Sequence, residues 1–119
     1  MVVLSGCADI GNDDGDLSKL GNGIPTVVQI HDPTCPRCRA LRRETYEAVA
    51  EFPEGQLQYL IANLQSGEGR RFAEDHGAES VTLILFDGEG NARETLVGER
   101  DSDALVSEFR RLIEASNQS

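Results

Sequence analysis

The chain has 119 residues, of which 39% are hydrophobic and 27% are charged, and its formal net charge is −10. This length suits one globular domain, which buries enough surface to fold without several disulfides or a structural metal. The acidic balance argues against a nucleic-acid-binding protein, because such proteins use a basic surface to displace the counterions of the phosphate backbone. No apolar run approaches the roughly 18 residues that indicate a membrane-spanning helix.

Residues 1–23 are predicted to form an irregular arm, because this segment is rich in glycine and aspartate. At most, residues 16–20 form a short helical turn. The sequence LSGC, which ends at Cys7, resembles the lipobox of a bacterial lipoprotein signal, although the charged and apolar regions of such a signal do not precede it. Two interpretations of Cys7 follow: a lipidated residue of a truncated leader in a periplasmic, membrane-anchored protein, or a spare thiol in a cytoplasmic protein.

Strand and helix patterns alternate after this arm. The β-branched run at residues 26–30 is bounded by prolines and predicts a buried strand. From Pro36 the apolar residues recur at steps of three and four, which predicts an amphipathic helix that continues to Pro53. Residues 57–64 (LQYLIANL) then predict a second strand.

The second half of the chain continues this alternation. A shorter helix is predicted to begin at Ser66 or Gly67 and to end at Gly77. Residues 81–86 and 92–97 are typical of two strands, and the five residues DGEGN between them contain two glycines. This pattern predicts an antiparallel hairpin.

A last helix is predicted after Gly98, with Asp101 as its cap. Its apolar stripe consists of Leu105, Phe109, Leu112 and Ile113. The order β-α-β-α-β-β-α indicates an α/β fold with a mixed four-stranded sheet that is covered on both faces. We expect the two links through helices to be parallel and right-handed, and the hairpin to add antiparallel pairing.

Two of the three cysteines, Cys35 and Cys38, fall where the first strand gives way to the longest helix. Residues three apart share one helix face, so the two sulfur atoms can approach bonding distance. Cys35 lies at the helix tip, where Pro36 suits the first turn and unpaired backbone N–H groups favour a thiolate. Arg37 and Arg39 are expected to add positive charge, so Cys35 is predicted to be the nucleophile.

From Pro25 onward the chain resembles the thioredoxin superfamily in the segments TVVQIHDPTCPRCRAL and GRRFAEDHGAESVTLILFDGEGN and in the closing amphipathic helix. The resemblance implies a three-layer thioredoxin-like domain over residues 24–119 and a dithiol–disulfide oxidoreductase. Cys35 would attack a disulfide in a protein or small thiol, and Cys38 would resolve the mixed disulfide. It also implies an external redox partner and neither a bound cofactor nor a metal; we expect a monomer.

Two positions differ from the usual pattern of this superfamily, which has a cis-proline before the third core strand and a buried acid before the first cysteine. Val81 or Thr82 stands in place of the proline, and we expect a trans peptide because a non-proline cis bond costs about 2.5–4 kcal/mol. Gln29 stands in place of the acid and cannot titrate. Proton transfer with the second cysteine would then fall to His31, Asp32 or water.

Other polar residues allow more than one interpretation. His31 either tunes Cys35, serves as a ligand, or makes a structural hydrogen bond. His76 is most simply a helix-terminal residue that interacts with the negative end of the helix dipole. An arginine cluster is either the solvated side of its helix or a site that recruits an acidic partner or glutathione-like carboxylates. This cluster consists of Arg37, Arg39, Arg42 and Arg43.

Two further functions stay open on the sequence alone. Cys35, Cys38 and His31 could supply three ligands to a metal ion or iron–sulfur cluster, with a fourth ligand from solvent or a second subunit. Alternatively, the fold could serve as a partner-binding module without turnover. In that case Cys35→Ser would leave the affinity for the partner unchanged.

Overall fold

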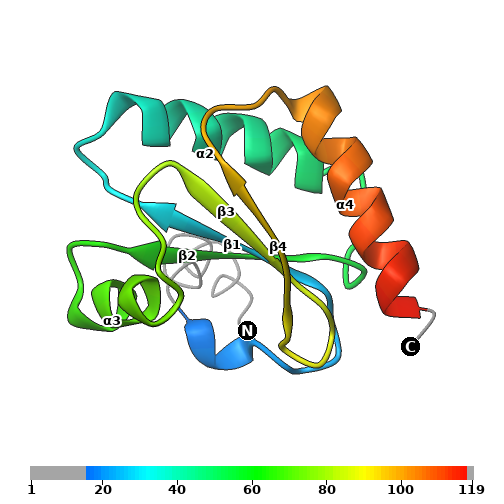
Figure 1. The fold of residues 1–119 in the computed structure, drawn as a ribbon. Coiled ribbons are helices and arrows are strands. Elements are labelled where there is room, and N and C mark those ends of the chain that lie inside the picture. The colour runs from blue at the N-terminus through cyan, green and yellow to red at the C-terminus, as the bar shows by residue number, and fades with distance from the viewer. Residues whose placement is uncertain (1–15, 118–119) are drawn as a thin grey trace, which may run out of the picture.

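Four strands form one mixed sheet with the order β2-β1-β3-β4 in the computed structural model, which describes residues 16–117 (Figure 1). The strands are β1 (Thr26–His31), β2 (Gln58–Asn63), β3 (Thr82–Phe86) and β4 (Ala92–Val97). β1 pairs in parallel with β2 and antiparallel with β3, and β3 pairs antiparallel with β4. The mixed four-stranded sheet and the predicted order of elements are confirmed.

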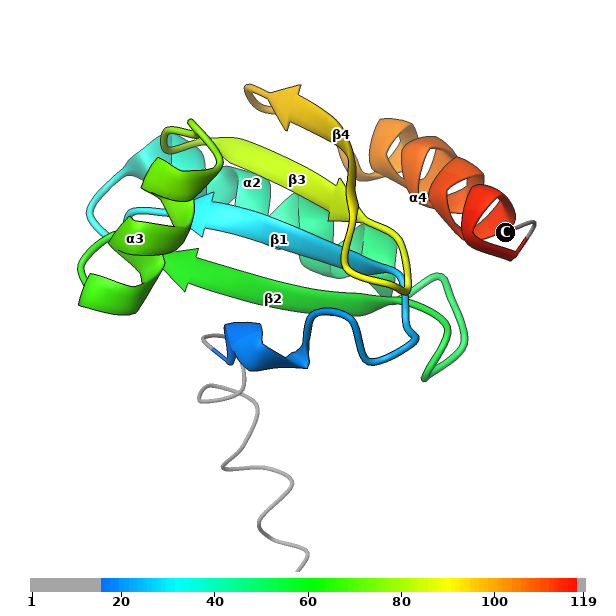
Figure 2. The same ribbon diagram turned by 60° about the horizontal axis from the view of Figure 1, so that its bottom comes forward.

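Helices cover both faces of this sheet. α2 (Pro36–Val49) and α4 (Ser102–Asn117) pack on one face, and α3 (Gly67–Asp75) lies on the other (Figure 2). The predicted helical turn near the N-terminus is the 3-10 helix η1 (Leu17–Lys19). Its first residue and Leu20 pack against the apolar cluster under α3. Within residues 16–117, no helix has the length and apolar character needed to cross a bilayer.

The core consists of two apolar clusters on opposite faces of the sheet, because alternate residues of a strand point to opposite sides. Val27 of β1 packs with residues of α2 and α4, whereas Val28 and Ile30 pack with residues of α3. All six residues of β1 are buried, as expected for a central strand between two helical layers. This enclosure fixes the carboxyl end of β1, where the cysteines follow.

The link from β2 to β3 is antiparallel, so the prediction of a second parallel link was wrong. With nine residues, α3 is about 13 Å long, which is shorter than the roughly 20 Å of a six-residue strand. It lies across the carboxyl end of β2 instead of returning along the sheet (Figure 2). The chain therefore enters β3 from the end at which it left β2.

Helix α2 ends at Val49 and does not continue to Pro53 as predicted. The backbone N–H groups of Glu51 and Phe52 donate to the carbonyl oxygens of Ala48 and Val49, both at 3.1 Å. These tighter bonds turn the chain before the proline, whose ring disfavours helical backbone in the preceding residue.

A second helix depends on a glycine for its position. Gly69 of α3 is buried against β2, and a Cβ atom at this residue would lie 2.1 Å from the carbonyl oxygen of Asn63. Glycine therefore permits the close approach of α3 to the end of β2.

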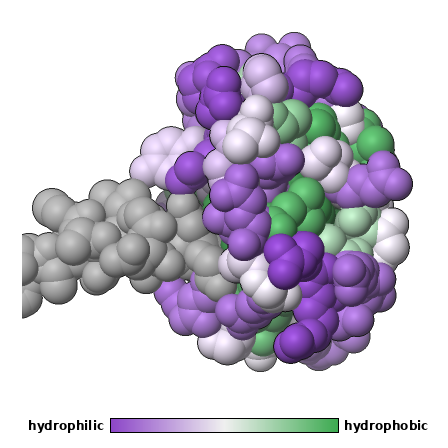
Figure 3. All heavy atoms as spheres, turned by 90° about the vertical axis from the view of Figure 1, so that its left-hand side faces the viewer, coloured by the Kyte–Doolittle hydropathy of each residue, from purple (hydrophilic) through white to green (hydrophobic). Residues whose placement is uncertain are grey.

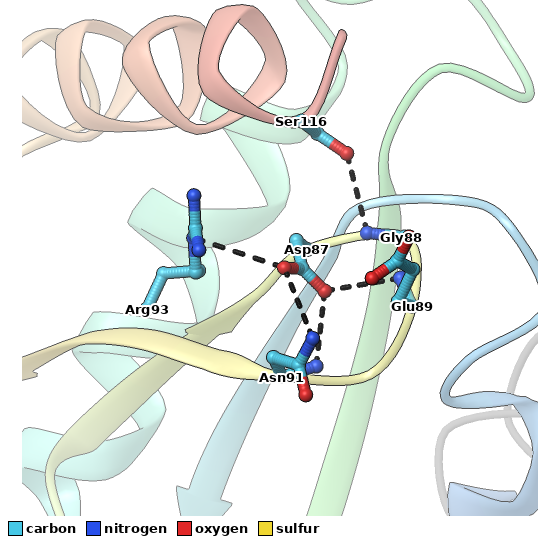
Figure 4. A network of polar contacts seen from close by, with 6 residues as sticks. All are labelled: Asp87, Gly88, Glu89, Asn91, Arg93 and Ser116. Carbon is cyan, nitrogen blue, oxygen red and sulfur yellow. Dashed lines mark hydrogen bonds and ion pairs between the residues drawn. The ribbon is translucent and has the colours of Figure 1, made fainter. Parts of the chain in front are cut away.

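The turn between β3 and β4 lies at the end of the sheet opposite the cysteines and closes around Asp87 (Figure 4). Its carboxylate accepts hydrogen bonds from the backbone N–H groups of Glu89 and Asn91, both at 3.0 Å. The N–H group of Gly88 donates to Oγ of Ser116 at 3.2 Å, which ties the turn to α4. The backbone hydrogen bond from Asn91 is the main reason that the pKa of Asp87 is lowered. The predicted hairpin is thus confirmed and closed by a buried acid.

Candidate active site

The loop after β1 places Cys35 at the start of α2. β1 extends one residue further than predicted, to His31. The carboxylate of Asp32 accepts hydrogen bonds from the backbone N–H and the hydroxyl of Thr34, at 3.0 and 2.8 Å. The N–H group of Cys35 donates to the carbonyl oxygen of Asp32 at 3.0 Å. Such turns around an aspartate reverse the chain locally, and this one directs it into the helix.

Cys35 is the N-cap of α2 and a half-buried free thiol. Its Sγ accepts a hydrogen bond from the backbone N–H of Cys38 at 3.2 Å, so sulfur takes the role that a serine or aspartate oxygen usually has. Pro36 follows at the first helical position, where the missing N–H has no partner to lose. The sulfur therefore lies against the positive end of the helix.

The pKa of the Cys35 thiol is lowered by groups of the first helical turn. The largest cause is the hydrogen bond from the Cys38 thiol, followed by the backbone N–H of Cys38; the backbone N–H of Arg37 adds to them. Partial burial and the charge of Asp32 act in the opposite direction. The side chain of Arg37 instead pairs with Glu99, with 3.0 Å between Nε and Oε2. Backbone and thiol donors, not this guanidinium, therefore favour the Cys35 thiolate.

Cys38 lies one turn further along α2 and is completely buried. Burial raises the pKa of its thiol, and donation of its S–H to Cys35 raises it further. The backbone of Asp32 and of Val81 acts on this pKa in the opposite direction. The Cys35 sulfur therefore lies within reach of the first helical turn, with a thiolate favoured at this half-buried sulfur and a thiol at the fully buried one.

The fully buried amide of Gln29 organises the polar groups behind Cys38. Its Nε2 donates to the carbonyl oxygen of Cys38 at 3.0 Å and lies 3.3 Å from Nδ1 of His31. Its Oε1 accepts a short hydrogen bond from the hydroxyl of Tyr59 on β2. Tyr59 was not predicted as a site residue, although a buried amide in an apolar strand requires such a partner. We refer to Gln29, His31, Tyr59 and the Cys38 carbonyl as the glutamine network.

His31 serves this network as a hydrogen-bond acceptor. It is only 5% exposed, and because Gln29 donates to Nδ1, the ring is neutral with its proton on Nε2. Burial is the main reason that its pKa is lowered, and the charge of Arg42 acts in the same direction. This arrangement favours the interpretation of a structural hydrogen bond.

His76 is the C-cap of α3, as its sequence position predicted. Its Nδ1 lies 2.9 Å from the carbonyl oxygen of Phe72, and the two rings are 4.3 Å apart between centroids. His76 is therefore part of the packing of α3 and lies outside the cysteine site.

Val81 stands beside the cysteines in an unusual backbone conformation. No peptide bond between residues 16 and 117 is cis, which confirms the trans peptide predicted at Val81 and Thr82. Over the same residues, Val81 is the one non-glycine with a positive φ, 61°, a costly conformation for a β-branched side chain. Its carbonyl oxygen accepts a hydrogen bond from the N–H of Gly98 at 2.8 Å, and its side chain packs in the cluster that contains Cys38. Thr82 is buried at the start of β3, opposite Ile30.

The face that includes the β1–α2 loop and α3 is shown in Figure 3. Apolar areas lie there between hydrophilic side chains. Val97, which is 68% exposed, lies on the edge strand β4 and pairs with Thr82. This pair is at the end of the sheet where the cysteines follow β1. An exposed apolar side chain therefore lies near the end of the sheet where the cysteines are.

Neither metal binding nor lipidation gains support from the geometry. In the described part of the chain, no three or more histidine, cysteine, aspartate or glutamate side chains are grouped so that they could hold a metal ion. His31, the third ligand considered, already bonds to Gln29 through Nδ1. Cys7 lies outside the described residues, and both interpretations of it remain predictions.

No family model matches the chain. Two thioredoxin-like HCF164 proteins of chloroplasts are similar to it: the one from Arabidopsis thaliana is 27% identical over 94 residues, and the one from rice is 28% identical over 80 residues. The matches cover 78% and 66% of this chain but 36% and 30% of the relatives. The chain thus spans about a third of the length of the curated relatives it matches.

Solved structures show the same fold. A thioredoxin-like protein from Clostridium perfringens has a TM-score of 0.72 at 22% identity, covering 93% of this chain and 91% of that protein. A thioredoxin from Thermus thermophilus has a TM-score of 0.67 at 17% identity, covering 79% and 77%. At the level of the family, these similarities support a function of the thiol–disulfide oxidoreductase type. The fold of the chain is therefore that of thioredoxin-like proteins, and the curated relatives it resembles are thioredoxin-like proteins as well.

Proposed function

We propose that the protein is a thiol–disulfide oxidoreductase that exchanges the Cys35–Cys38 dithiol with disulfides of a protein or small-thiol substrate. The single observation that carries this proposal is the opposite treatment of two neighbouring thiols. Cys35 accepts hydrogen bonds at an accessible helix tip, whereas Cys38 is buried one turn away and donates to it. A low-pKa thiol beside a second cysteine is the arrangement that disulfide exchange requires.

The reaction takes place in two exchange steps. The Cys35 thiolate attacks one sulfur of the substrate disulfide, so a Cys35–substrate bond forms and the first substrate thiolate leaves. Cys38 then attacks Cys35, and the second substrate thiolate leaves as the Cys35–Cys38 disulfide forms. The proton lost by Cys38 is taken up by a departing substrate thiolate. The substrate gains two electrons and the cysteine pair loses two, which an external dithiol partner restores.

Burial of Cys38 determines the order of the two exchange steps. A sulfur with no exposed surface cannot meet a macromolecular disulfide, so substrate reaches Cys35 first. Once Cys35 is in a mixed disulfide, it neither accepts the Cys38 proton nor carries a negative charge, which removes two of the three causes of the raised Cys38 pKa and leaves burial. The attack that releases the product therefore becomes easier after the substrate has been captured.

The direct test is to trap the intermediate. In the full chain, the Cys38→Ser variant should accumulate a mixed disulfide with a protein whose disulfides are accessible, such as insulin, because the resolving thiol is absent. The matched control Cys35→Ser should accumulate none. Peptide mapping by mass spectrometry must place the bond on Cys35, since Cys7 is also a cysteine. A bond on Cys7 alone, or equal trapping by both variants, would contradict the proposal.

A redox titration against glutathione provides a second test. The wild-type chain should pass from a dithiol to an intramolecular Cys35–Cys38 disulfide as the ratio of oxidised to reduced glutathione rises. A chain that forms no such bond at any ratio would leave the partner-binding module without turnover as the better interpretation.

A further inference from the structure

The two exposed flanks of α2 carry opposite charge. Toward α4, the helix presents Glu44 and Glu47, and Glu51 follows just after its end; these three residues line hollows shared with Asp101 and Asp103. On the other flank, three arginines and a tyrosine are spaced three or four residues apart, which makes all four neighbours on one face of the helix. We refer to Arg39, Arg42, Arg43 and Tyr46 as the basic stripe.

The basic stripe borders a hollow of about 490 Å³, of which Glu47 forms one edge. Tyr46 is 60% exposed and is one of two large apolar side chains with this much exposure in residues 16–117. Arg39 is held in place by a hydrogen bond from its guanidinium to the carbonyl oxygen of Pro33 at 3.0 Å, in the loop before Cys35. The stripe therefore combines positive charge with an accessible ring and is joined to the loop that positions the nucleophile.

We propose that the basic stripe docks an acidic segment of the protein substrate, beside the disulfide that Cys35 attacks. This inference rests on the proposed function, because only an exchange enzyme would turn the docked substrate over. The choice of an acidic partner is argued from charge complementarity. Guanidinium groups pair with carboxylates through directed hydrogen bonds, and the exposed ring of Tyr46 offers a contact for an apolar side chain between acidic residues.

The stripe is close enough to the nucleophile to orient a substrate. At 1.5 Å of rise per residue, Arg39 and Arg43 lie about 6 and 12 Å along the helix from Cys35. The Debye length at physiological ionic strength is about 8 Å, so local charges at contact outweigh the distant acids that give the chain a net charge of −10. When the cysteine of a peptide reaches Cys35, the few peptide residues that follow this cysteine would therefore contact the basic stripe.

The overall charge also sets what kind of acidic partner fits. A long polyanion such as a nucleic acid would extend over the surrounding glutamates and aspartates and be repelled there. A short acidic run on a protein surface can lie within the stripe and avoid the acidic flank toward α4. The neighbouring Glu47 marks the boundary between the two flanks.

The experiment uses two peptides that differ only in a run of residues after the cysteine, glutamates in one and glutamines in the other. Serine-for-cysteine versions of both, labelled with a fluorophore, measure affinity for the full-length chain by anisotropy. Versions in which the peptide cysteine forms a disulfide with a small thiol measure turnover as kcat/KM, with a dithiol reductant present to restore the Cys35–Cys38 pair. The variant is Arg43→Glu, and the matched control is Arg71→Glu, an exposed arginine of α3 on the opposite face of the sheet.

The wild-type chain should bind the glutamate peptide more tightly than the glutamine peptide. This preference should fall about fivefold in Arg43→Glu and stay unchanged in Arg71→Glu, since reversal of one exposed charge pair has an effect of this size. The preference should also weaken as the salt concentration rises.

Equal affinity for the two peptides, or the same loss in both variants, would overturn the inference. Competition by oxidised glutathione at the same concentration as the peptide would also overturn it, because the carboxylates recognised would then be those of a small thiol. Preferred binding of the glutamate peptide without turnover of either disulfide would refute the proposed function and leave the docking surface standing.

Discussion

Each end of the sheet contains a buried polar side chain, and the two are used differently. At one end, the Asp87 carboxylate accepts hydrogen bonds from the turn that it closes, and Nε of Arg93 lies 3.7 Å from it. At the other end, Gln29 bonds to His31, Tyr59 and the Cys38 carbonyl. The first network holds a charge, whereas every member of the second is neutral.

The difference leaves no charged group in the network behind Cys38. A neutral glutamine network supports the backbone of α2 behind Cys38 without a charge that would compete for its proton. The helix tip then acts on Cys35 through N–H and S–H donors. At the Asp87 end the charge is fully used in closing the turn, so that end contributes to stability and not to chemistry.

The largest expected effect comes from removing the glutamine network. Gln29→Leu should lower the free energy of unfolding by about 3 kcal/mol, because it leaves the Tyr59 hydroxyl and the Cys38 carbonyl buried without this partner. Urea denaturation measures the change. The matched control Thr45→Val removes one buried hydrogen bond within α2, to the carbonyl of Leu41, and should cost about 1 kcal/mol. Equal losses in the two variants would show that Gln29 has no organising role.

At the opposite end of the sheet, Asp87→Asn should lower the free energy of unfolding by about 2 kcal/mol, because the amide accepts the hydrogen bonds of the turn without a charge. The folded pKa of Asp87 lies below its unfolded value, so its contribution is present above about pH 4 and is lost as the pH falls through the folded pKa. Urea denaturation at several pH values should thus show a flatter acid limb for Asp87→Asn. An unchanged limb would mean that this carboxylate is not stabilised by folding.

The left-handed backbone at Val81 should make a glycine variant more stable than an alanine variant, which is the reverse of the usual order. Val81→Gly and Val81→Ala both remove the side chain, but alanine keeps the Cβ atom that a φ of 61° penalises. The glycine variant should therefore be about 1 kcal/mol more stable than the alanine variant in thermal or urea unfolding. A more stable alanine variant would indicate that residue 81 does not hold a left-handed conformation in solution.

The smallest effect is expected for the ion pair of Arg37 and Glu99, which is exposed on both sides. Arg37→Ala should change the free energy of unfolding by no more than about 0.5 kcal/mol. It should also leave the pH profile of Cys35 alkylation in place, because the backbone N–H of Arg37 acts on the sulfur and alanine keeps it. A clear upward shift of that profile would assign the effect to the guanidinium.

Most of the fold was predictable from local patterns. The change of apolar spacing at Pro36 predicted the start of α2, and Asp101 does cap α4 by accepting a hydrogen bond from the N–H of Ala104 at 2.9 Å. The direction of β3 was not predictable in this way. It depends on where α3 lies against the sheet, and a short helix can return along a strand or cross its end.

The site divides in the same manner. The cysteine spacing placed Cys35 and Cys38 on one face of one helix, which the structure shows. The partner of Gln29 comes from β2, thirty residues further along the chain, and the left-handed backbone of Val81 has no sequence signal because glycine or asparagine is usual there. Contacts between distant segments and strain imposed by packing are the features that local patterns leave out.

The opposite treatment of the two thiols can be measured by alkylating the reduced full-length chain over a range of pH and following each cysteine separately by mass spectrometry. We expect Cys35 to react with a midpoint below the value of about 8.5 for a free thiol, and Cys38 to react only at higher pH. A midpoint for Cys35 at or above that value, or modification of Cys38 before Cys35, would contradict this expectation.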